Sequence, residues 1–294
     1  MLFYSFKNYL KDKFPGSKVY KIGLDAGFSC PHRTSDTRMG GCIYCENRSF
    51  SPYAGLSPRP PISEQIKNGI DFYRRRYKAD KFIVYFQAYT NTLGPIDKLK
   101  SLYDEALSHP DIIGLSIGTR PDCVSDNVLD LITEYTKKYE VWLEYGLQSA
   151  NDKTLEFINR GHKYIDFEDA VKRTKGRNIS IATHIILGLP GEEKNDMLQS
   201  VQKVVNLCIN PVRDRSSQRD DRNYVSGVFE NDNHTNTMTK PSKDLKNISN
   251  GVKFHHLYVA KNTQLAKLYE QNPISQIPYP NYTIHLRRIY SINQ

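Results

Sequence analysis

From residue 19 onward the sequence alternates six times between short apolar stretches and amphipathic stretches. The apolar stretches are rich in β-branched and aromatic residues, which is typical of buried strands. The amphipathic stretches repeat apolar residues with helical spacing, as at Ile62, Ile66 and Ile70. The predicted strands cover 19–27, 81–89, 112–118, 140–147, 179–187 and 251–259. The predicted helices cover 62–77, 96–109, 126–138, 151–176, 193–208 and 263–270.

Six strand–helix units in succession predict an α/β fold with an all-parallel sheet and right-handed crossovers. Six units are too few for a closed eightfold barrel, but they suit a partial (β/α)6 barrel of the TIM type. A doubly wound flat sheet is the competing fold. In both folds, ligands bind at the loops that follow the carboxyl ends of the strands.

A polar stretch over residues 210–250 interrupts the alternation just before the last predicted strand. It is rich in Asn, Asp, Ser, Arg and Lys, and we predict a disordered surface insertion there. An RNA-contacting arm is the alternative, against which the mixture of both charge signs argues. The predicted organisation is therefore a core over 1–209 with five strands, the insertion, and a final segment over 251–294 with the sixth strand and a tail.

Composition limits the compartment and the partners. The first fourteen residues carry three lysines and lack the apolar run of a signal peptide, and the chain has no apolar stretch of the ~18 residues that a membrane span needs. We therefore expect a cytoplasmic protein with no membrane partner, in which five cysteines serve metal binding or chemistry rather than disulfides. The net charge of +9 is compatible with a polyanionic partner and equally with an ordinary basic surface.

Three of the five cysteines, Cys30, Cys42 and Cys45, lie within sixteen residues, directly after the first predicted strand. Two cysteines separated by two residues chelate one metal centre from a tight turn, and a third closes the site from across a loop. Gly40 and Gly41 let the backbone approach that centre closely. The spacing and the position favour an iron–sulfur cluster with one open iron at the rim of a barrel.

Zinc is the alternative metal for this triad. A structural zinc site requires four protein ligands in nearly every case, and the fourth would be His32 or a distant residue.

The cysteine loop and the stretches around it resemble a known family. With Tyr44 just before the third cysteine, the triad resembles the radical S-adenosylmethionine (SAM) signature in a form with a long first gap. The chain resembles the YhcC/YtqA-like subfamily, a relative of the elongator-type tRNA-modifying radical SAM enzymes. The similarity covers residues 3–208 and 251–270. It is carried by GGCIYC, FQAYTNT, GTRPD, LEYGLQS, NRGH and HIILGLPGE.

This resemblance implies a 4Fe–4S cluster and SAM as cofactors. It further implies reductive cleavage of SAM to methionine and a 5′-deoxyadenosyl radical, with a tRNA base as the expected target and flavodoxin or ferredoxin as the type of electron donor. The basic run 74–78 at a helix end fits RNA but also fits a solvated helix face. The same chemistry on a small metabolite or protein, and a non-catalytic zinc-bearing RNA-binding module, remain alternatives.

The resemblance also implies roles for residues near the strand ends. Tyr44 corresponds to the position beside adenine, although a core aromatic is the plainer interpretation. Gln87 and Tyr89 fall where such enzymes contact the methionine amino group. Arg120 is predicted to clamp a carboxylate or phosphate, with a rim ion pair to Asp122 as the alternative.

Further roles are implied at the fourth and fifth strands. Glu144 and Gln148 suit the ribose hydroxyls or the methionine moiety. Gly188 and Glu192 lie in a turn similar to the family's adenine-contact turn. No catalytic residue is predicted.

Residues outside these motifs receive weaker expectations. Of the two remaining cysteines, Cys208 is expected to be buried, and Cys123 is a weaker candidate for substrate chemistry. The histidines at 184, 255 and 256 receive no role.

Overall fold

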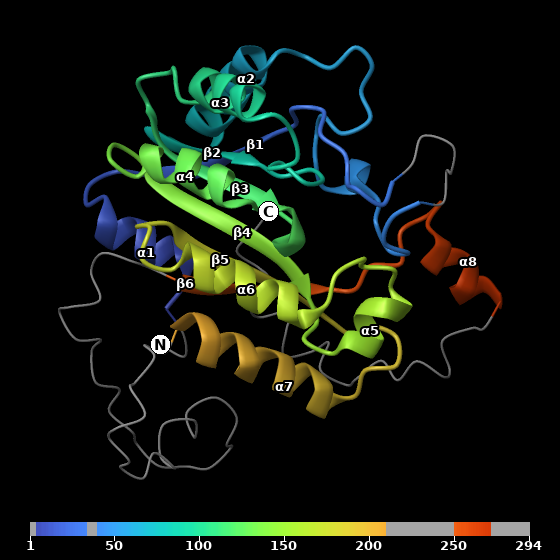
Figure 1. Cartoon of the computed structure of the whole chain (residues 1–294). Helices are drawn as coiled ribbons and strands as arrows, with labels where there is room; N and C mark the ends of the chain where they lie inside the picture. The colour runs from blue at the N-terminus through green and yellow to red at the C-terminus, as the bar shows by residue number, and fades with distance from the viewer. Residues whose placement is uncertain (1–3, 34–39, 210–249, 272–294) are drawn as a thin grey trace, which may run out of the picture.

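The computed structural model describes residues 4–33, 40–209 and 250–271 (Figure 1). Within them, six parallel strands form one sheet in the order of the sequence, and the sheet is curled into a half-barrel. The strands are β1 (Val19–Leu24), β2 (Lys81–Phe86), β3 (Ile112–Thr119), β4 (Glu140–Gln148), β5 (Ser180–Leu187) and β6 (Asn250–His256). The predicted partial barrel is confirmed. The flat alternative is excluded because a doubly wound sheet reverses its strand order at a switch point, and this sheet does not.

A helix follows each strand, and those after β1 to β5 lead the chain to the next strand. These helices are α2 (Ile62–Tyr77), α3 (Ile96–Ala106), α4 (Asp126–Tyr135), α5 (Asp152–Phe157) with α6 (Tyr164–Thr174), α7 (Lys194–Val204) and α8 (Gln264–Gln271). The predicted helix over 193–208 is shorter than expected, because its last turn widens into a π-helical segment at Val205–Ile209. Of the predicted insertion over 210–250, residues 210–249 lie outside the described residues, and Asn250 is the first residue of β6 rather than part of an insertion.

One face of the sheet is apolar and is covered by helices α2, α3, α4, α6 and α7 (Figure 1). Alternate strand residues point to it, such as Val84, Leu115 and Leu143, which are fully buried. They pack against helix residues such as Ile66 and Leu99 in one continuous core. This outer face therefore carries the main hydrophobic contribution to stability.

The inner face of the half-barrel carries polar and aromatic residues together with several glycines. At its amino end it is covered by α1 (Phe6–Lys13), a helix that the sequence had not predicted. The Phe6 ring lies edge-on to Trp142 of β4 at 5.2 Å, and Tyr9 donates a hydrogen bond to Glu140 at 2.6 Å. Figure 1 shows α1 at one end of the strands and α5 and α8 at the other, so the opposite, carboxyl end holds the loops.

None of the helices in the described ranges is long and apolar enough to cross a membrane.

Candidate metal centre and cofactor site

The cysteine loop leaves the carboxyl end of β1, as predicted, and two of its thiols are fixed by neighbouring side chains. The Thr90 hydroxyl, from the loop after β2, donates to Cys30 Sγ at 3.3 Å. The Asn47 amide donates to Cys45 Sγ at 3.6 Å. The Cys45 N–H closes a tight turn on the Cys42 carbonyl at 3.0 Å. The intervening residues 34–39 lie outside the described part of the chain.

The loop is anchored on the opposite side of the half-barrel opening. The Ile43 N–H donates to the carbonyl of Ile158 at 3.1 Å, after α5, and the Ile43 carbonyl accepts from Leu265 of α8 at 2.9 Å. The Asn159 side chain donates to the Gly41 carbonyl at 2.8 Å. Ile43 also belongs to a second apolar cluster with Leu155, Ile158, Ile186, Leu189 and Leu265. These contacts hold the second and third cysteines over the strand ends.

The three thiols lie close enough to influence one another's ionisation, because a negative charge on Cys42 disfavours one on Cys30 or Cys45. Burial raises the pKa of Cys30 and raises that of Cys45 to about 11. Burial acts on Cys42 in the same direction, but Arg160 and His32 outweigh it and lower its pKa to about 6. A metal centre that prefers thiolates therefore finds one thiol already poised to ionise.

Arg160 links the end of β4 to the cysteine loop, and sequence reasoning did not assign it a role. Its guanidinium is buried, donates to the Gly146 carbonyl through Nε at 3.1 Å, and contacts Cys42 Sγ through Nη1 at 3.6 Å. A buried cation requires an anionic neighbour, and thiolates with a cluster supply one. The available signal was the NRGH stretch, which we had noted as part of the resemblance without naming its arginine.

The donor set fits an iron–sulfur cluster better than a single ion. In the described ranges no group of three or more His, Cys, Asp and Glu side chains is close enough to hold one metal ion. A cluster is several ångström across, so its thiolate ligands are farther apart than those of one ion. Three neighbouring thiols supply the ligands that such a cluster takes, and Arg160 beside Cys42 supplies a positive charge to offset theirs.

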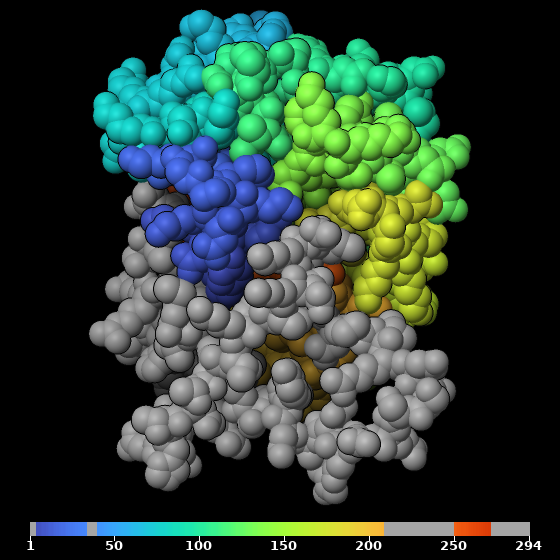
Figure 2. Space-filling model, turned by 90° about the vertical axis from the view of Figure 1, so that its left-hand side faces the viewer, coloured from blue at the N-terminus to red at the C-terminus, as the bar shows by residue number. Residues whose placement is uncertain are grey.

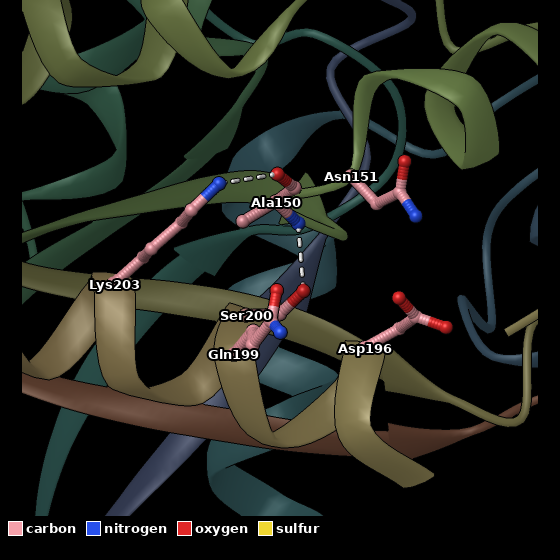
Figure 3. A pocket seen from close by; sticks show the side chains of 6 residues that line it. All are labelled: Ala150, Asn151, Asp196, Gln199, Ser200 and Lys203. Carbon is pink, nitrogen blue, oxygen red and sulfur yellow. Dashed lines mark hydrogen bonds between the residues drawn. The ribbon is translucent and has the colours of Figure 1, made fainter. Parts of the chain in front are cut away.

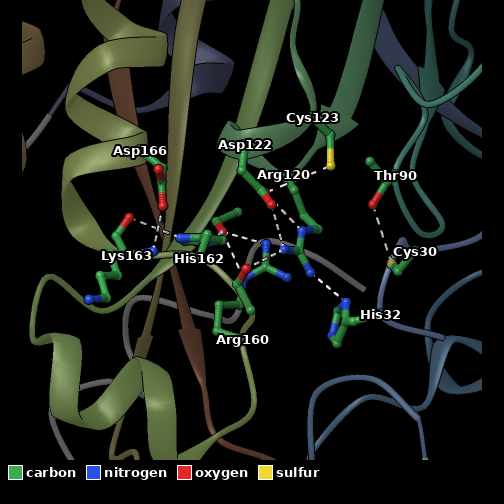
Figure 4. A network of polar contacts seen from close by, with 12 residues as sticks. Cys30, His32, Thr90, Arg120, Asp122, Cys123, Arg160, His162, Lys163 and Asp166 are labelled. Carbon is green, nitrogen blue, oxygen red and sulfur yellow. Dashed lines mark hydrogen bonds and ion pairs between the residues drawn. The ribbon is translucent and has the colours of Figure 1, made fainter.

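His32 does not suit the zinc alternative. Its Nδ1 faces Nη1 of Arg120 at hydrogen-bond distance (Figure 4). Its Nε2 lies 3.6 Å from Cys42 Sγ. A zinc-bound histidine carries a hydrogen on the nitrogen that does not bind the metal. With zinc on Nε2, that hydrogen would point at a guanidinium donor. His32 instead accepts from Arg120 and donates to Cys42, which fixes its tautomer.

Arg120, predicted to clamp an anion, lies 3% exposed between three partners (Figure 4). It forms a bidentate pair with Asp122 at 2.9 and 2.6 Å, donates to the Gly161 carbonyl at 2.9 Å, and contacts His32. Four of its five N–H groups are therefore used within the protein. This geometry corresponds to the ion-pair alternative, and it makes Arg120 a positioning residue for His32.

Two predicted cofactor contacts have unusual backbone conformations near the carboxyl ends of their strands: Gln148 is the last residue of β4, and Tyr89 lies in the loop after β2. Tyr89 has φ 68° and Gln148 has φ 78°, in the left-handed region that side chains rarely adopt. Both are half-buried at the carboxyl end of the sheet, and the Arg33 guanidinium lies 5.3 Å from the Tyr89 ring. Gln87 follows β2, and its side chain fills the space beside Gly23 of β1. The geometry brings these residues to the predicted rim, and strain of this kind is characteristic of ligand sites.

Tyr44 is half-buried against the apolar cluster under the cysteine loop. Burial and the neighbouring Cys42 raise the pKa of its hydroxyl well above its usual value, so the ring stays neutral. This position is compatible with both sequence interpretations, a ring beside adenine and a packed aromatic.

Two further predicted residues lie in the loop after β5. Gly188 has φ 85°, a conformation that glycine adopts readily. The Glu192 carboxylate accepts from the Ser149 hydroxyl of the loop after β4, and burial raises its pKa. Glu192 therefore ties two neighbouring strand-end loops together.

Glu144 is 1% exposed at mid-height on the inner face of β4. Its carboxylate contacts Lys21, Ser116, His184 and Lys253 and has little acceptor capacity left. The structure therefore places it in a protein-internal network below the rim.

The remaining sequence candidates differ in their distance from the cysteine loop, and Cys123 lies near enough to Cys30 for the two thiols to interact electrostatically. Cys208 is buried as expected, and burial beside Asp122 raises the pKa of Cys123 to about 11, which makes it a poor nucleophile. The basic run 74–78 ends α2 and precedes the start of β2, so it lies at the end of the sheet opposite the cysteines.

A polar hollow of about 270 Å³ lies on the outer side, between α7 and the loop after β4 (Figure 3). Lys203 donates to the Ala150 carbonyl at 3.2 Å, and Ser200 accepts from the Ala150 N–H at 2.9 Å. These hydrogen bonds fasten the helix to the strand end and do not face the thiols.

Comparison with known proteins gives a consistent result. Residues 30–204 match the model of the radical SAM superfamily. Protein YhcC of Escherichia coli K12 is 36% identical over 270 residues, which cover 92% of this chain and 73% of that protein. YtqA of Bacillus subtilis is 29% identical over 282 residues, covering 95% and 74%. A Fusobacterium nucleatum tRNA-2-methylthio-N(6)-dimethylallyladenosine synthase is 28% identical over 189 residues, covering 62% of this chain and 42% of the synthase.

Proposed function

The chain belongs to the radical SAM superfamily, with a 4Fe–4S cluster and SAM as its cofactors, and on this premise we propose that it modifies a tRNA base by radical chemistry. When bound, the cluster supplies one electron that splits SAM into methionine and a 5′-deoxyadenosyl radical able to abstract hydrogen. The observation that carries the proposal is the group of three thiols fixed at the carboxyl ends of the strands by Thr90, Asn47 and Arg160.

The protein's own residues hold and shield this centre. Cys30, Cys42 and Cys45 are the proposed ligands, with Arg160 offsetting their negative charge and His32 donating to Cys42. The apolar cluster beneath the cysteine loop excludes water from one side. A reactive intermediate requires such exclusion.

Contacts with SAM are proposed at the strand ends. Gln87, Tyr89 and Gln148 are the best supported, because they surround the rim and two of them have strained backbones. Tyr44 is proposed beside adenine and Gly188 in the adenine-contact turn.

Three other predicted SAM contacts have less support. Arg120, Glu144 and Glu192 are each engaged by protein partners, which favours positioning roles for them.

Support for tRNA comes from the similarity to the F. nucleatum synthase, whose name states a tRNA product, and from the net charge of +9. The basic run 74–78 adds little, because it lies at the far end of the sheet and Arg74 already pairs with Asp111. The exposed Arg48, beside the cysteine loop, lies nearer the thiols but is likewise paired, in two hydrogen bonds to Glu46 at 3.0 and 3.2 Å.

The test is anaerobic reconstitution with iron and sulfide, followed by measurement of 5′-deoxyadenosine with dithionite, or with flavodoxin or ferredoxin as the proposed electron donor. We expect total tRNA to increase 5′-deoxyadenosine formation and to gain a new nucleoside by mass spectrometry. Formation that is indifferent to tRNA, with no new nucleoside, would contradict the tRNA assignment. A sample that binds zinc and no iron would contradict the radical chemistry.

A second candidate substrate is a small molecule with an anionic group. The surplus of positive charge on the inner face favours it, as developed in the next subsection.

A further inference from the structure

A cluster of polar side chains occupies the middle of the inner face, and each of its members comes from a different strand. We name it the lumen cluster. Its members are Lys21 of β1, Tyr85 of β2, Ser116 of β3, Glu144 of β4, His184 of β5 and Lys253 of β6.

Glu144 is the centre of the lumen cluster. One carboxylate oxygen accepts from Lys21 and Ser116, and the other accepts from His184 at 2.7 Å and lies 3.6 Å from Lys253 Nζ. The Glu144 carboxylate of β4 thus contacts side chains from four other strands, β1, β3, β5 and β6. Because the acceptor positions of Glu144 are filled, the cluster offers donors rather than acceptors to an incoming group.

The lumen cluster carries more positive than negative charge. In the described ranges, the amino groups of Lys21 and Lys253 face the single carboxylate of Glu144. Burial lowers the pKa of Lys21, Glu144 opposes that shift, and Lys253 adds to it, so Lys253 is the main source of positive charge. His184 donates to Glu144 and lies 3.2 Å from His255, and burial lowers the pKa of both histidines, so they add no charge near neutral pH. A surplus of positive charge that is partly shielded from water is unfavourable, and a bound anion relieves it.

The two ammonium groups are accessible, whereas their counter-ion is not. The Lys253 and Lys21 side chains are 40% and 24% exposed, and that of Glu144 is 1% exposed. Lys21 already donates to Glu144 and Ser116, and both lysines flank the Tyr85 ring at about 5 Å. Lys253 is 3.6 Å from Glu144, beyond good hydrogen-bond distance, which leaves it the freer donor.

The lumen cluster lies just below the thiols. Gly146, two residues after Glu144 on β4, accepts from Arg160, which contacts Cys42. At a rise of ~3.3 Å per residue, the cluster is about 7 Å below that level. Figure 2 shows α1 in blue at the opposite end of the half-barrel, where the strands begin, covering part of that end. A group that reaches the cluster thus lies between the aromatic side chains at that end and the thiols.

We propose that the lumen cluster binds one oxyanion, a carboxylate or phosphate, of the substrate through Lys253 and Lys21. Binding there holds the rest of the substrate toward the thiols. The inference rests on the proposed function in that the reaction takes place inside the half-barrel, and it does not depend on tRNA.

The test is lysine footprinting on the reconstituted protein at constant ionic strength. Inorganic phosphate, acetate or chloride is added, lysines are acetylated with an activated ester, and modification is read by mass spectrometry. We expect phosphate or acetate, relative to chloride, to protect Lys253 and Lys21 while exposed Lys98 of α3 stays equally reactive. The stronger protector of the two identifies a phosphate or a carboxylate.

Variants measure the contribution of the charge. A hydrogen bond to a charged group contributes about 1.5–3 kcal/mol, so Lys253→Gln should weaken binding of the protecting anion roughly 10- to 100-fold. Binding is read from the anion concentration that raises the melting temperature. Lys253→Arg should retain binding, and Lys98→Gln removes the same charge from the outside as a matched control. Iron content and circular dichroism verify folding.

Equal protection in phosphate, acetate and chloride would overturn the inference, and so would unchanged anion binding by a folded Lys253→Gln. The wild-type footprint decides the matter if that variant does not fold. Anion binding without 5′-deoxyadenosine formation would remove the proposed function and leave this inference. Formation of 5′-deoxyadenosine without anion binding at Lys253 and Lys21 would contradict this inference and leave the proposed function.

Discussion

The outer and inner faces of the sheet are built by the same six strands, yet they differ in almost every physical property. The outer face is a continuous apolar core between strands and helices, with residues such as Phe86 and Leu115 fully buried. The inner face carries ammonium groups, a buried carboxylate and histidines. The difference arises because successive side chains of a strand point to opposite faces of the sheet. One set of side chains can therefore form the core that stabilises the fold, while the other set lines the site.

The rim at the carboxyl end of the inner face should give the largest functional effect. Cys42→Ala removes one of three ligands and the thiol nearest Arg160, so we expect nearly complete loss of bound iron and of 5′-deoxyadenosine formation. Iron content and chromatography of the reaction products check this. Cys208→Ala, on the outer side of the sheet, is the matched control and should retain both. Full SAM cleavage by Cys42→Ala would contradict the assignment of the three cysteines as the cluster ligands.

The outer face should give the largest stability effect. Phe86→Ala deletes a ring that is 0% exposed and lies 5.4 Å from the Tyr103 ring, and such substitutions cost about 3–5 kcal/mol. Urea unfolding of the cluster-free protein measures the difference. Tyr85→Phe removes a hydroxyl from the neighbouring inner position and should cost about 1 kcal/mol. If the inner change costs as much as the outer one, the two faces do not divide stability and function in this way.

The inner face should also make stability depend on pH. Burial, His184 and Lys253 lower the pKa of His255 to about 3, whereas an unfolded histidine titrates at ~6.5. Below pH 6.5 the unfolded state therefore binds more protons than the folded state. The contribution of His255 to the free energy of unfolding is fully present above pH 6.5 and is lost as the pH falls toward 3.

Between pH 7 and pH 5 the contribution of His255 to this loss is up to about 2 kcal/mol. Between pH 7 and pH 5, the free energy of unfolding of His255→Gln should therefore fall by up to about 2 kcal/mol less than that of the wild type. Urea unfolding at both pH values measures the two losses. The burial of His184 gives a loss of the same sign in both proteins, so it cancels. Parallel losses in variant and wild type would contradict the depressed pKa.

The sequence was sufficient for the outer face and insufficient for much of the inner one. The helix over Ile62–Tyr77 was predicted to the residue, because its apolar spacing is a local property. Helix α1 was missed, since its eight residues are stabilised by distant contacts such as Phe6 with Trp142.

The contacts of the site join residues that are far apart in the sequence, and local sequence patterns do not predict such contacts. The cysteine triad could be found from its spacing, but the approach of Arg160 to Cys42 brings together residues 118 apart. Lys21 and Glu144 are 123 residues apart and meet because the sheet is curled. Alternation along a strand divides its residues between two faces, and it does not tell which charges on the concave face will neutralise one another.

Two glycines test the packing of the two faces directly, and the one on the inner face should give the smallest effect of all. A Cβ on Gly69 of α2 would lie 2.4 Å from Cγ2 of Ile22, a stiff and 2% exposed side chain of β1. A Cβ on Gly251 of β6, on the inner face, would meet nothing within 4 Å.

Gly69→Ala gains ~1 kcal/mol of helix propensity but forces Ile22 or the helix to move, and overpacking of this kind costs about 1–3 kcal/mol, so we expect a net loss of up to about 2 kcal/mol. Gly251→Ala should change the unfolding free energy by less than about 0.5 kcal/mol, since its methyl enters open space. Urea unfolding of the two variants side by side measures both values. A stabilised Gly69→Ala would mean that the helix–sheet interface yields easily, and a destabilised Gly251→Ala would mean that the inner face is filled at that level. Either result would reduce the contrast between a packed outer face and an open inner one, on which the placement of a substrate inside the half-barrel depends.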